Sequence, residues 1–274
     1  GTIGIAAIWT LLKLVQPVIA GLSSAMAASR VRAAGQGATL PRTEQDIPIG
    51  LVGVISLLCL APIGWLLARF AGEAGIGDHV ALLVGGGLVF TVLMSFLVSA
   101  VCGYMAGLIG SSNSPLSGVG YLVVIGAALL LVFAVKPLLG GADHGAGLVA
   151  FALFITAVVF AVATIANNNL QDLKTGQLVD ATPWKQQVAL IVGVIAGAAV
   201  IPPVMDMLNH AYGFAGAPGV TSKNALAAPQ AALMSALASG VIEGKLDWNM
   251  IGYGIAIGAG VILLDEVLAR RTRH

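Results

Sequence analysis

The sequence predicts an all-α fold, a polytopic transmembrane helical bundle with about seven spanning helices and one or two interrupted or re-entrant segments. Hydrophobic residues make up 58% of the 274 residues and charged residues only 9%, whereas soluble domains carry about 25% charged residues. Long apolar stretches without charge recur along the chain, which is typical of membrane-spanning helices. Glycine is also abundant, at 36 residues, and it favours close packing between such helices.

The first three predicted spans are residues 3–27, 49–70 and 80–109. Each is at least as long as the roughly 20 residues that a helix needs to cross the hydrocarbon core. A polar segment with several arginines separates the first span from the second, and a short acidic connection separates the second from the third. The third span ends at a run of serine and asparagine.

The later predicted spans are residues 118–135, 147–165, 188–208 and 250–268. Between the second and third of these lies a conspicuously polar segment, which we interpret as a helix end followed by a loop. A further apolar segment at residues 228–240 is too short to cross a bilayer. We expect it to enter the membrane and return on the same side.

The basic residues give this layout an orientation, because loops rich in lysine and arginine stay in the cytoplasm. If the loop after the first span is cytoplasmic and residues 228–240 do not cross, three strongly basic segments fall on the cytoplasmic side. Together they hold eight of the thirteen lysines and arginines, namely Arg30, Arg32, Arg42, Lys174, Lys185, Arg270, Arg271 and Arg273.

A polar run, "SSNSP" at residues 111–115, interrupts the apolar sequence. Backbone that leaves a helix at membrane depth needs hydrogen-bond partners in the protein or in a water-filled cavity, and Pro115 prevents regular helix there. Two interpretations stay open: a cytoplasmic turn, or a broken segment whose polar groups line a substrate path. A second interrupted segment, "AAPQAAL" at residues 227–233, supports the substrate path, because paired interruptions are typical of transporter binding regions.

Four segments of the sequence resemble the oligopeptide transporter (OPT) family, which includes peptide transporters and the yellow-stripe-like carriers of metal chelates. They occur in the same order and the likeness covers nearly the whole chain. The segments are "TEQDIPIG" (43–50), "GLIGSSNSPLSGVG" (107–120), "NLQDLKTGQLVDATPWKQQ" (169–187) and "APQAALMSALASGVIEGKLDWNMIGYG" (228–254).

The resemblance implies an integral membrane protein with many more helices than seven that works as a proton-coupled symporter. It also implies that this chain is the C-terminal part of such a carrier. We therefore expect residues 1–274 to be part of a single transmembrane transporter domain that is truncated at the N-terminus. The family commonly has an acidic residue just before "NLQDLKTG", where this chain has Asn168. If that acid carries protons in the relatives, this chain lacks its equivalent.

Two polar groups of residues have alternative interpretations. Lys13 and Gln16 share one face of the first span, and a charge at membrane depth usually faces a cavity, unless Lys13 snorkels to the interface. The asparagine-rich run at residues 167–172 is either a helix cap with a solvated loop or a set of amides and a carboxylate that face the transport path. Glu266, near the end of the last span, is expected to be solvated.

No enzyme signature is found, since the sequence has no Walker loop, GxSxG or HExxH pattern. We expect no catalytic residue, metal site or cofactor. His79, His144 and His210 are expected on outer loops and lack the spacing of a metal site. The net charge of +1 gives no reason to expect a nucleic-acid partner.

The expected function is a secondary active transporter of small oligopeptides or peptide-like metal chelates, coupled to protons, in the bacterial inner (cytoplasmic) membrane. The alternatives are a non-transporting membrane scaffold or subunit and a carrier of another small organic solute. Expected partners are the lipid bilayer, a small peptide or metal-chelate substrate, protons, the remainder of the transporter chain, and further copies in a homo-oligomer. The expected substrate-binding residues are Ser111, Ser112, Asn113, Ser114, Pro115, Asn167, Asn168, Asn169, Gln171, Asp172, Pro229, Gln230, Lys13 and Gln16.

Overall fold

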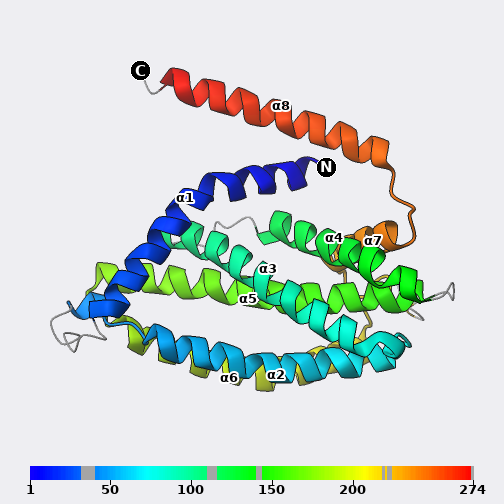
Figure 1. Ribbon diagram of the computed structural model, residues 1–274, viewed down its shortest axis with the longest axis horizontal. Helices are drawn as coiled ribbons and strands as arrows, with labels where there is room; N and C mark the ends of the chain where they lie inside the picture. Colours follow the sequence, from blue (N-terminus) through cyan, green and yellow to red (C-terminus); the bar gives the residue numbers. More distant parts are fainter. Residues whose placement is uncertain (32–40, 110–115, 140–143, 218–219, 221–223, 273–274) are drawn as a thin grey trace.

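The computed structural model describes residues 1–31, 41–109, 116–139, 144–217, 220 and 224–272, and these form a helical bundle (Figure 1). The only β-structure among them is an isolated bridge between Phe214 and Leu226. Three short 3-10 turns are η3 (Arg42–Glu44), η4 (Gly77–His79) and η5 (Lys136–Leu138). The α-helices are α1 (Thr2–Val31), α2 (Ile49–Glu73), α3 (Val80–Ile109), α4 (Leu116–Ala134), α5 (Gly145–Leu178), α6 (Pro183–Ala211), α7 (Pro229–Ile242) and α8 (Trp248–Thr272).

The prediction of an all-α membrane fold is confirmed. In the described part of the chain, every α-helix except α7 is long and apolar enough to cross a membrane, which makes seven candidate spans. Helix α7 has 14 residues, which is about 21 Å of helix and too short to cross the hydrocarbon core. Each of the seven predicted spans corresponds to one of these helices, with differences at the ends.

The predicted end of the fifth span, at residue 165, is wrong. Helix α5 continues through the asparagine-rich run to Leu178, over 34 residues in all. The run holds good helix formers and no proline, so its polarity does not stop the helix. The helix ends where Asp180 adopts a φ of 53° and Pro183 opens α6. Residues 167–178 are therefore helical, and the interpretation of this stretch as a loop is corrected.

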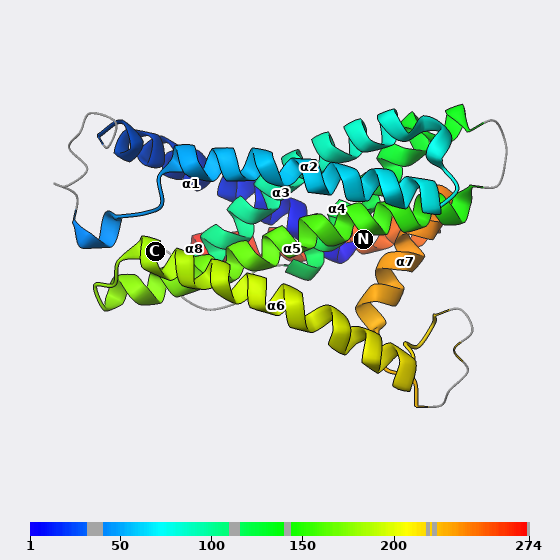
Figure 2. The same cartoon turned by 90° about the horizontal axis from the view of Figure 1, so that it is seen from below.

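The helix ends define two ends of the bundle (Figures 1 and 2). Helices α1, α5 and α8 finish at the end where α2 and α6 begin. Arg30 lies in the last turn of α1, and Arg270 and Arg271 in the last turn of α8. We call this the basic end, and its charge is what the positive-inside layout requires. Helix α6 ends and helix α8 begins at the other end of the bundle. The segment between them, which carries α7, therefore starts and finishes on the same side.

The core lies where α3, α4 and α5 pack together. Helices α3 and α5 run in the same direction, and small residues on α3 let them approach closely. A Cβ on Gly87 would lie 3.3 Å from Ile155 Cδ1, and one on Gly103 would lie 3.3 Å from Leu170 Cδ2. Phe151 is fully buried; removing a ring of this kind from a core costs about 3–5 kcal/mol.

Helices α2, α6 and α8 expose most of their apolar side chains, which suits a hydrocarbon environment. Leu58 on α2 is 67% exposed, for example. Helix α8 packs alongside α1 in a parallel pair, in which Thr2 Oγ1 donates to the carbonyl of Gly254 at 2.8 Å. Gly258 lies directly against Ile5 and Thr2. The small residues of α8 therefore serve helix packing.

Candidate functional site

The predicted site residues at the polar break lie outside the described residues; they are Ser111, Ser112, Asn113, Ser114 and Pro115. The helix that follows them, α4, is described from its first residue. Helix α4 begins at Leu116 and runs for 19 residues, which is about 28 Å. The start of α4 lies inside the bundle and does not reach the basic end (Figure 1). The residues that open α4 therefore mark the depth at which the polar break ends.

The two interrupted segments begin side by side. Gln230, the second residue of α7, donates from Nε2 to Ser117 Oγ, the second residue of α4, at 3.3 Å. Helix α7 starts with Pro229 and its N-cap residue Ala228 makes no side-chain capping bond. The first N–H groups of a helix have no partner within the helix and carry the positive end of its dipole. Two such helix starts therefore converge at Ser117 and Gln230.

Helix α5 passes this junction at Gly120. A Cβ on Gly120 would lie 2.6 Å from Phe160 Cε2 of α5 and 3.0 Å from Met234 Cε of α7. Ser117 lies about 4.5 Å from Gly120 along α4, and Asn167 lies about 10 Å from Phe160 along α5, both toward the basic end. The asparagine-rich run therefore starts about one turn past the level at which α4 and α7 begin.

The residues of that run point to different sides of α5. Asn167 is buried, with 2% of its surface exposed, and its Nδ2 lies 3.5 Å from Asn168 Oδ1. Asn168 and Asp172 are exposed, and Asn169 and Gln171 are half-buried. Of these predicted site residues, Asn167 is the one whose side chain lies within the bundle. The run spans more than one helical turn, so its members do not share one face.

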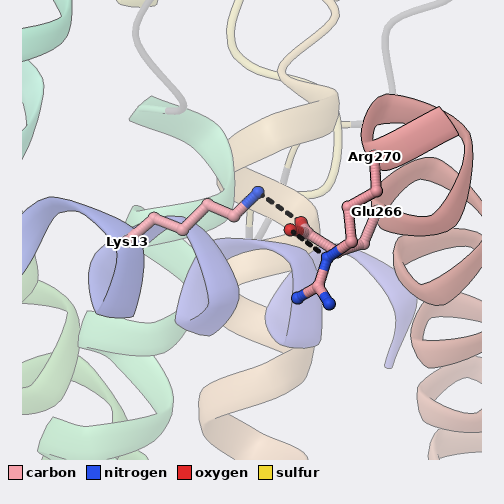
Figure 3. A network of polar contacts seen from close by, with 3 residues as sticks. All are labelled: Lys13, Glu266 and Arg270. Carbon is pink, nitrogen blue, oxygen red and sulfur yellow. Dashed lines mark hydrogen bonds and ion pairs between the residues drawn. The ribbon is translucent and has the colours of Figure 1, made fainter. Parts of the chain in front are cut away.

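Lys13 lies in an interhelical ion pair. Its Nζ is 2.8 Å from Glu266 Oε2 on α8, and Arg270 Nε lies 3.8 Å from Glu266 Oε1. Figure 3 shows the three side chains converging between the two helices. Lys13 is also 5.2 Å from the centre of the Trp9 ring. The expectation that Glu266 is merely solvated was wrong, because it holds Lys13. Gln16 lies exposed on α1, one turn further along.

A cavity of about 700 Å³ borders α7, next to the segment that follows α6. Its walls come from α5, α6, α7 and the segment before α7, and they consist mainly of small side chains. Two hydrogen bonds, Ala215 N to Leu226 O at 2.8 Å and Leu226 N to Gly213 O at 2.9 Å, hold that segment folded back on itself. We call this the α7 cavity; it is lined by Leu153, Met205, Phe214, Ala215, Gly216, Ala217, Ala228, Ala231, Ala232, Ser235, Ala236 and Ser239.

A second cavity, of about 260 Å³, lies at the basic end of α5, and we call it the basic-end cavity. It begins at Leu170, less than one turn past Asn167. Its walls come from α3, α5, the segment before α2 and the start of α6, and they are more polar than those of the α7 cavity. The lining residues are Thr43, Asp46, Gly107, Leu170, Leu173, Lys174, Gln177 and Pro183.

Two segments far apart in the sequence interlock beside this cavity. Gln187 donates from Nε2 to Asp46 Oδ1 at 3.0 Å and accepts at Oε1 from the N–H of Ile47 at 3.0 Å. Arg42 Nε donates to Thr182 Oγ1 at 2.9 Å. The N–H of Trp184 donates to the carbonyl of Gln45 at 3.0 Å. We call residues 41–48 together with 182–187 the clasp; it explains why two polar sequence segments have fixed positions.

The sequence offered no signal for the clasp or for the basic-end cavity. Asp46 and Lys174 lie far apart in the chain, and no local spacing connects them. Among the described residues, no group of three or more His, Cys, Asp or Glu is placed to hold a metal ion. His79 instead contacts the carbonyl of Leu138 at 3.1 Å, and His210 contacts the carbonyl of Asp206 at 2.9 Å.

Comparison with known proteins is consistent across the whole chain. A family model described as "OPT oligopeptide transporter protein" matches residues 1–274. A "Putative oligopeptide transporter" of Haemophilus influenzae is 44% identical over 276 residues, an alignment that covers 98% of this chain and 43% of that protein. The chain thus spans less than half the length of this curated relative. No solved structure matches the chain.

Proposed function

Since the chain belongs to the OPT oligopeptide transporter family, we propose that the protein that carries it is a secondary active transporter of small oligopeptides or peptide-like metal chelates. Its seven apolar helices and its family make it an integral membrane protein. We further propose that residues 1–274 are part of a single transmembrane domain, that transport is coupled to protons, and that the membrane is the bacterial inner membrane. In this proposal the protein is a carrier and not an enzyme.

The observation that carries the proposal is the contact between Ser117 and Gln230. It brings together the starts of α4 and α7 beside α5, with Ser117 half-buried and Gln230 exposed. In transporters, the starts of interrupted helices at mid-membrane point at anionic groups of the substrate. The first N–H groups of α4 and α7, which have no partner within their own helices, and the side chains of Ser117 and Gln230 supply donors for the carbonyl and carboxylate oxygens of a peptide.

The two cavities give the proposed path its direction. The α7 cavity contacts α5 at Leu153, and the basic-end cavity contacts it from Leu170 onward. Between them Phe160 and Met234 pack over Gly120. We propose that this packed layer separates the two cavities, and that alternating access opens one side of it at a time. The substrate then passes the polar groups of Ser117, Gln230 and Asn167.

The scaffold alternative predicts that the interrupted segments lie far apart and border no cavity. The described starts of α4 and α7 are instead in contact, and α7 lines a cavity of about 700 Å³. Both features favour transport over a purely structural role. They do not distinguish peptides from another small organic solute, so the substrate is tested directly.

The test is uptake by the whole polypeptide in proteoliposomes, with labelled di- to tetrapeptides and ferric chelates compared with and without a pH gradient. We expect uptake of peptides or chelates that rises when the outside is acidic. Asn113→Ala and Asp172→Asn should each reduce uptake and leave expression intact. Absence of uptake for every substrate in both conditions would contradict the proposed function.

A further inference from the structure

The basic-end cavity carries one side chain of each charge. Asp46 comes from the clasp and Lys174 from α5, and both line the same space of about 260 Å³. Lys174 Nζ donates to Gln177 Oε1 at 3.2 Å, and Asp46 Oδ1 accepts from Gln187 Nε2 at 3.0 Å. Each charge is thus held in place by a neutral amide, and the two charges belong to different walls of the cavity.

A short peptide with free ends carries the complementary pair of charges. Its terminal ammonium and terminal carboxylate are about 7 Å apart in an extended dipeptide. A volume of about 260 Å³ lies just below the roughly 300–1,000 Å³ of pockets that hold drug-sized ligands, so the occupant is small. Metal ions and apolar solutes carry no such pair of opposite charges at fixed separation.

We propose that the basic-end cavity binds a zwitterionic di- or tripeptide by both ends. Asp46 accepts hydrogen bonds from the terminal ammonium, and Lys174 donates to the terminal carboxylate. Hydrogen bonds between ionised groups are shorter and about twice as strong as neutral ones. Gln177 and Thr43, also on the cavity wall, supply polar groups for the peptide bond. This inference rests on the proposed transport of peptides and narrows its substrate class.

The surroundings fix the position of both charges before a peptide arrives. Gln187 holds the exposed carboxylate of Asp46 and the neighbouring N–H of Ile47 at once, so two hydrogen bonds limit the movement of this segment. Lys174 lies on a continuous helix, one turn past Leu170. Prepositioned groups bind more tightly, because less conformational freedom is lost on binding. The first α5 residue on the cavity wall, Leu170, lies less than one turn past Asn167.

The experiment compares three labelled substrates in proteoliposomes that hold the whole polypeptide: dialanine, its N-acetylated form and its C-terminal amide. The wild type should take up dialanine at least about 10-fold faster than either blocked form, since a hydrogen bond to a charged group contributes about 1.5–3 kcal/mol. Lys174→Gln should abolish the preference over the amide and keep the preference over the acetylated form. Asp46→Asn should do the reverse.

Matched controls separate charge recognition from folding. The Asn side chain at position 46 still offers an oxygen to Gln187, so the clasp keeps its hydrogen bond. Arg271→Gln and Asp180→Asn remove charges at the same end of the bundle but outside the cavity and the clasp, and both preferences should survive. Size-exclusion profiles in detergent identify any variant that fails to fold.

Three results would overturn the inference. Equal uptake of free and blocked dialanine by the wild type is the first, and it needs no variant. The second is that transporting Lys174→Gln and Asp46→Asn proteins keep both wild-type preferences. The third is that each variant loses both preferences together. If the wild type takes up ferric chelates but no peptide, the inference fails and the proposed function stands; if it takes up neither, both fail.

Discussion

Gln230 Nε2 lies 3.3 Å from Ser117 Oγ and so joins the start of α7 to the start of α4 across 113 residues of sequence. Both residues occupy the second position of their helices: Gln230 follows Pro229 on α7, and Ser117 lies two residues past the "SSNSP" run on α4. The first backbone N–H groups of a helix have no partner within that helix. Two helix starts in contact therefore bring several such donors close together. The predictions below test this junction and the packing that holds it.

Removing the polar group of either residue should weaken substrate binding. For Gln230→Ala and Ser117→Ala we expect KM for uptake to rise about 10-fold, with a smaller change in maximal rate, because each variant removes one donor or acceptor at the junction. The measurement is concentration-dependent uptake in proteoliposomes. Ser99→Ala, whose hydroxyl bonds only to Phe96 O of its own helix, is the control; an equal effect in that variant would refute a local role for the junction.

Gly120 should not tolerate a side chain. A Cβ there would lie 2.6 Å from the Phe160 ring and 3.0 Å from Met234 Cε, so Gly120→Ala forces the Phe160 ring and the end of Met234 to shift. We expect a loss of about 1–3 kcal/mol, as for other overpacked cores, seen as a lower Tm in detergent. Gly85→Ala, where a Cβ meets nothing within 4 Å, should leave Tm unchanged or raise it. Partial recovery in Gly120→Ala with Phe160→Leu would locate the clash.

The pair of Lys13 and Glu266 should stabilise the packing of α8 on α1. Lys13→Met removes the ammonium that lies 2.8 Å from Glu266, and Glu266→Gln removes the negative charge that lies between Lys13 and Arg270. Each single change should lower stability by about 1 kcal/mol, the upper range for partly exposed pairs. The double variant should lose less than the sum of the two. Strict additivity in thermal unfolding would show that the two side chains do not interact.

Gly176 should be required for the clasp. Its backbone lies directly against the amide of Gln186, so Gly176→Ala must displace Gln186 and disturb the neighbouring bonds of Gln187. We expect faster proteolysis of the segment at residues 41–48 in that variant. Gly193→Ala on α6, where a Cβ meets nothing within 4 Å, is the matched control. Gln186→Ala in the same chain should restore protection, and persistent cleavage would argue against this contact as the cause.

Much of this fold could be predicted from local hydrophobicity. Residues 80–109 were predicted as one span, and α3 has these bounds, because an uninterrupted apolar run has only one stable state in a bilayer. The polar residues after residue 165 predict that the fifth span ends there, and this prediction is wrong. Helix propensity and the glycine-poor stretch before Gly176 carry α5 on to Leu178.

The candidate site was less accessible to sequence reasoning. The interruptions near residues 111–115 and 229–230 were visible because proline and polar residues stand out in an apolar chain. The contact between Ser117 and Gln230, the pairing of Lys13 with Glu266 and the shared cavity of Asp46 and Lys174 depend on how helices pack. Such long-range pairs leave no spacing pattern within a single sequence.

The most direct test of the account is whether water reaches the junction of α4 and α7. Ser117→Cys and Gln230→Cys are placed singly in the whole polypeptide with Cys59→Ser and Cys102→Ala, and Leu58→Cys on the exposed face of α2 is the control. We predict that a charged, membrane-impermeant thiol reagent modifies positions 117 and 230 and leaves position 58 unmodified. A transported peptide should slow the reaction at positions 117 and 230. Protection of positions 117 and 230 from that reagent, with reaction only toward a lipid-soluble maleimide, would contradict it.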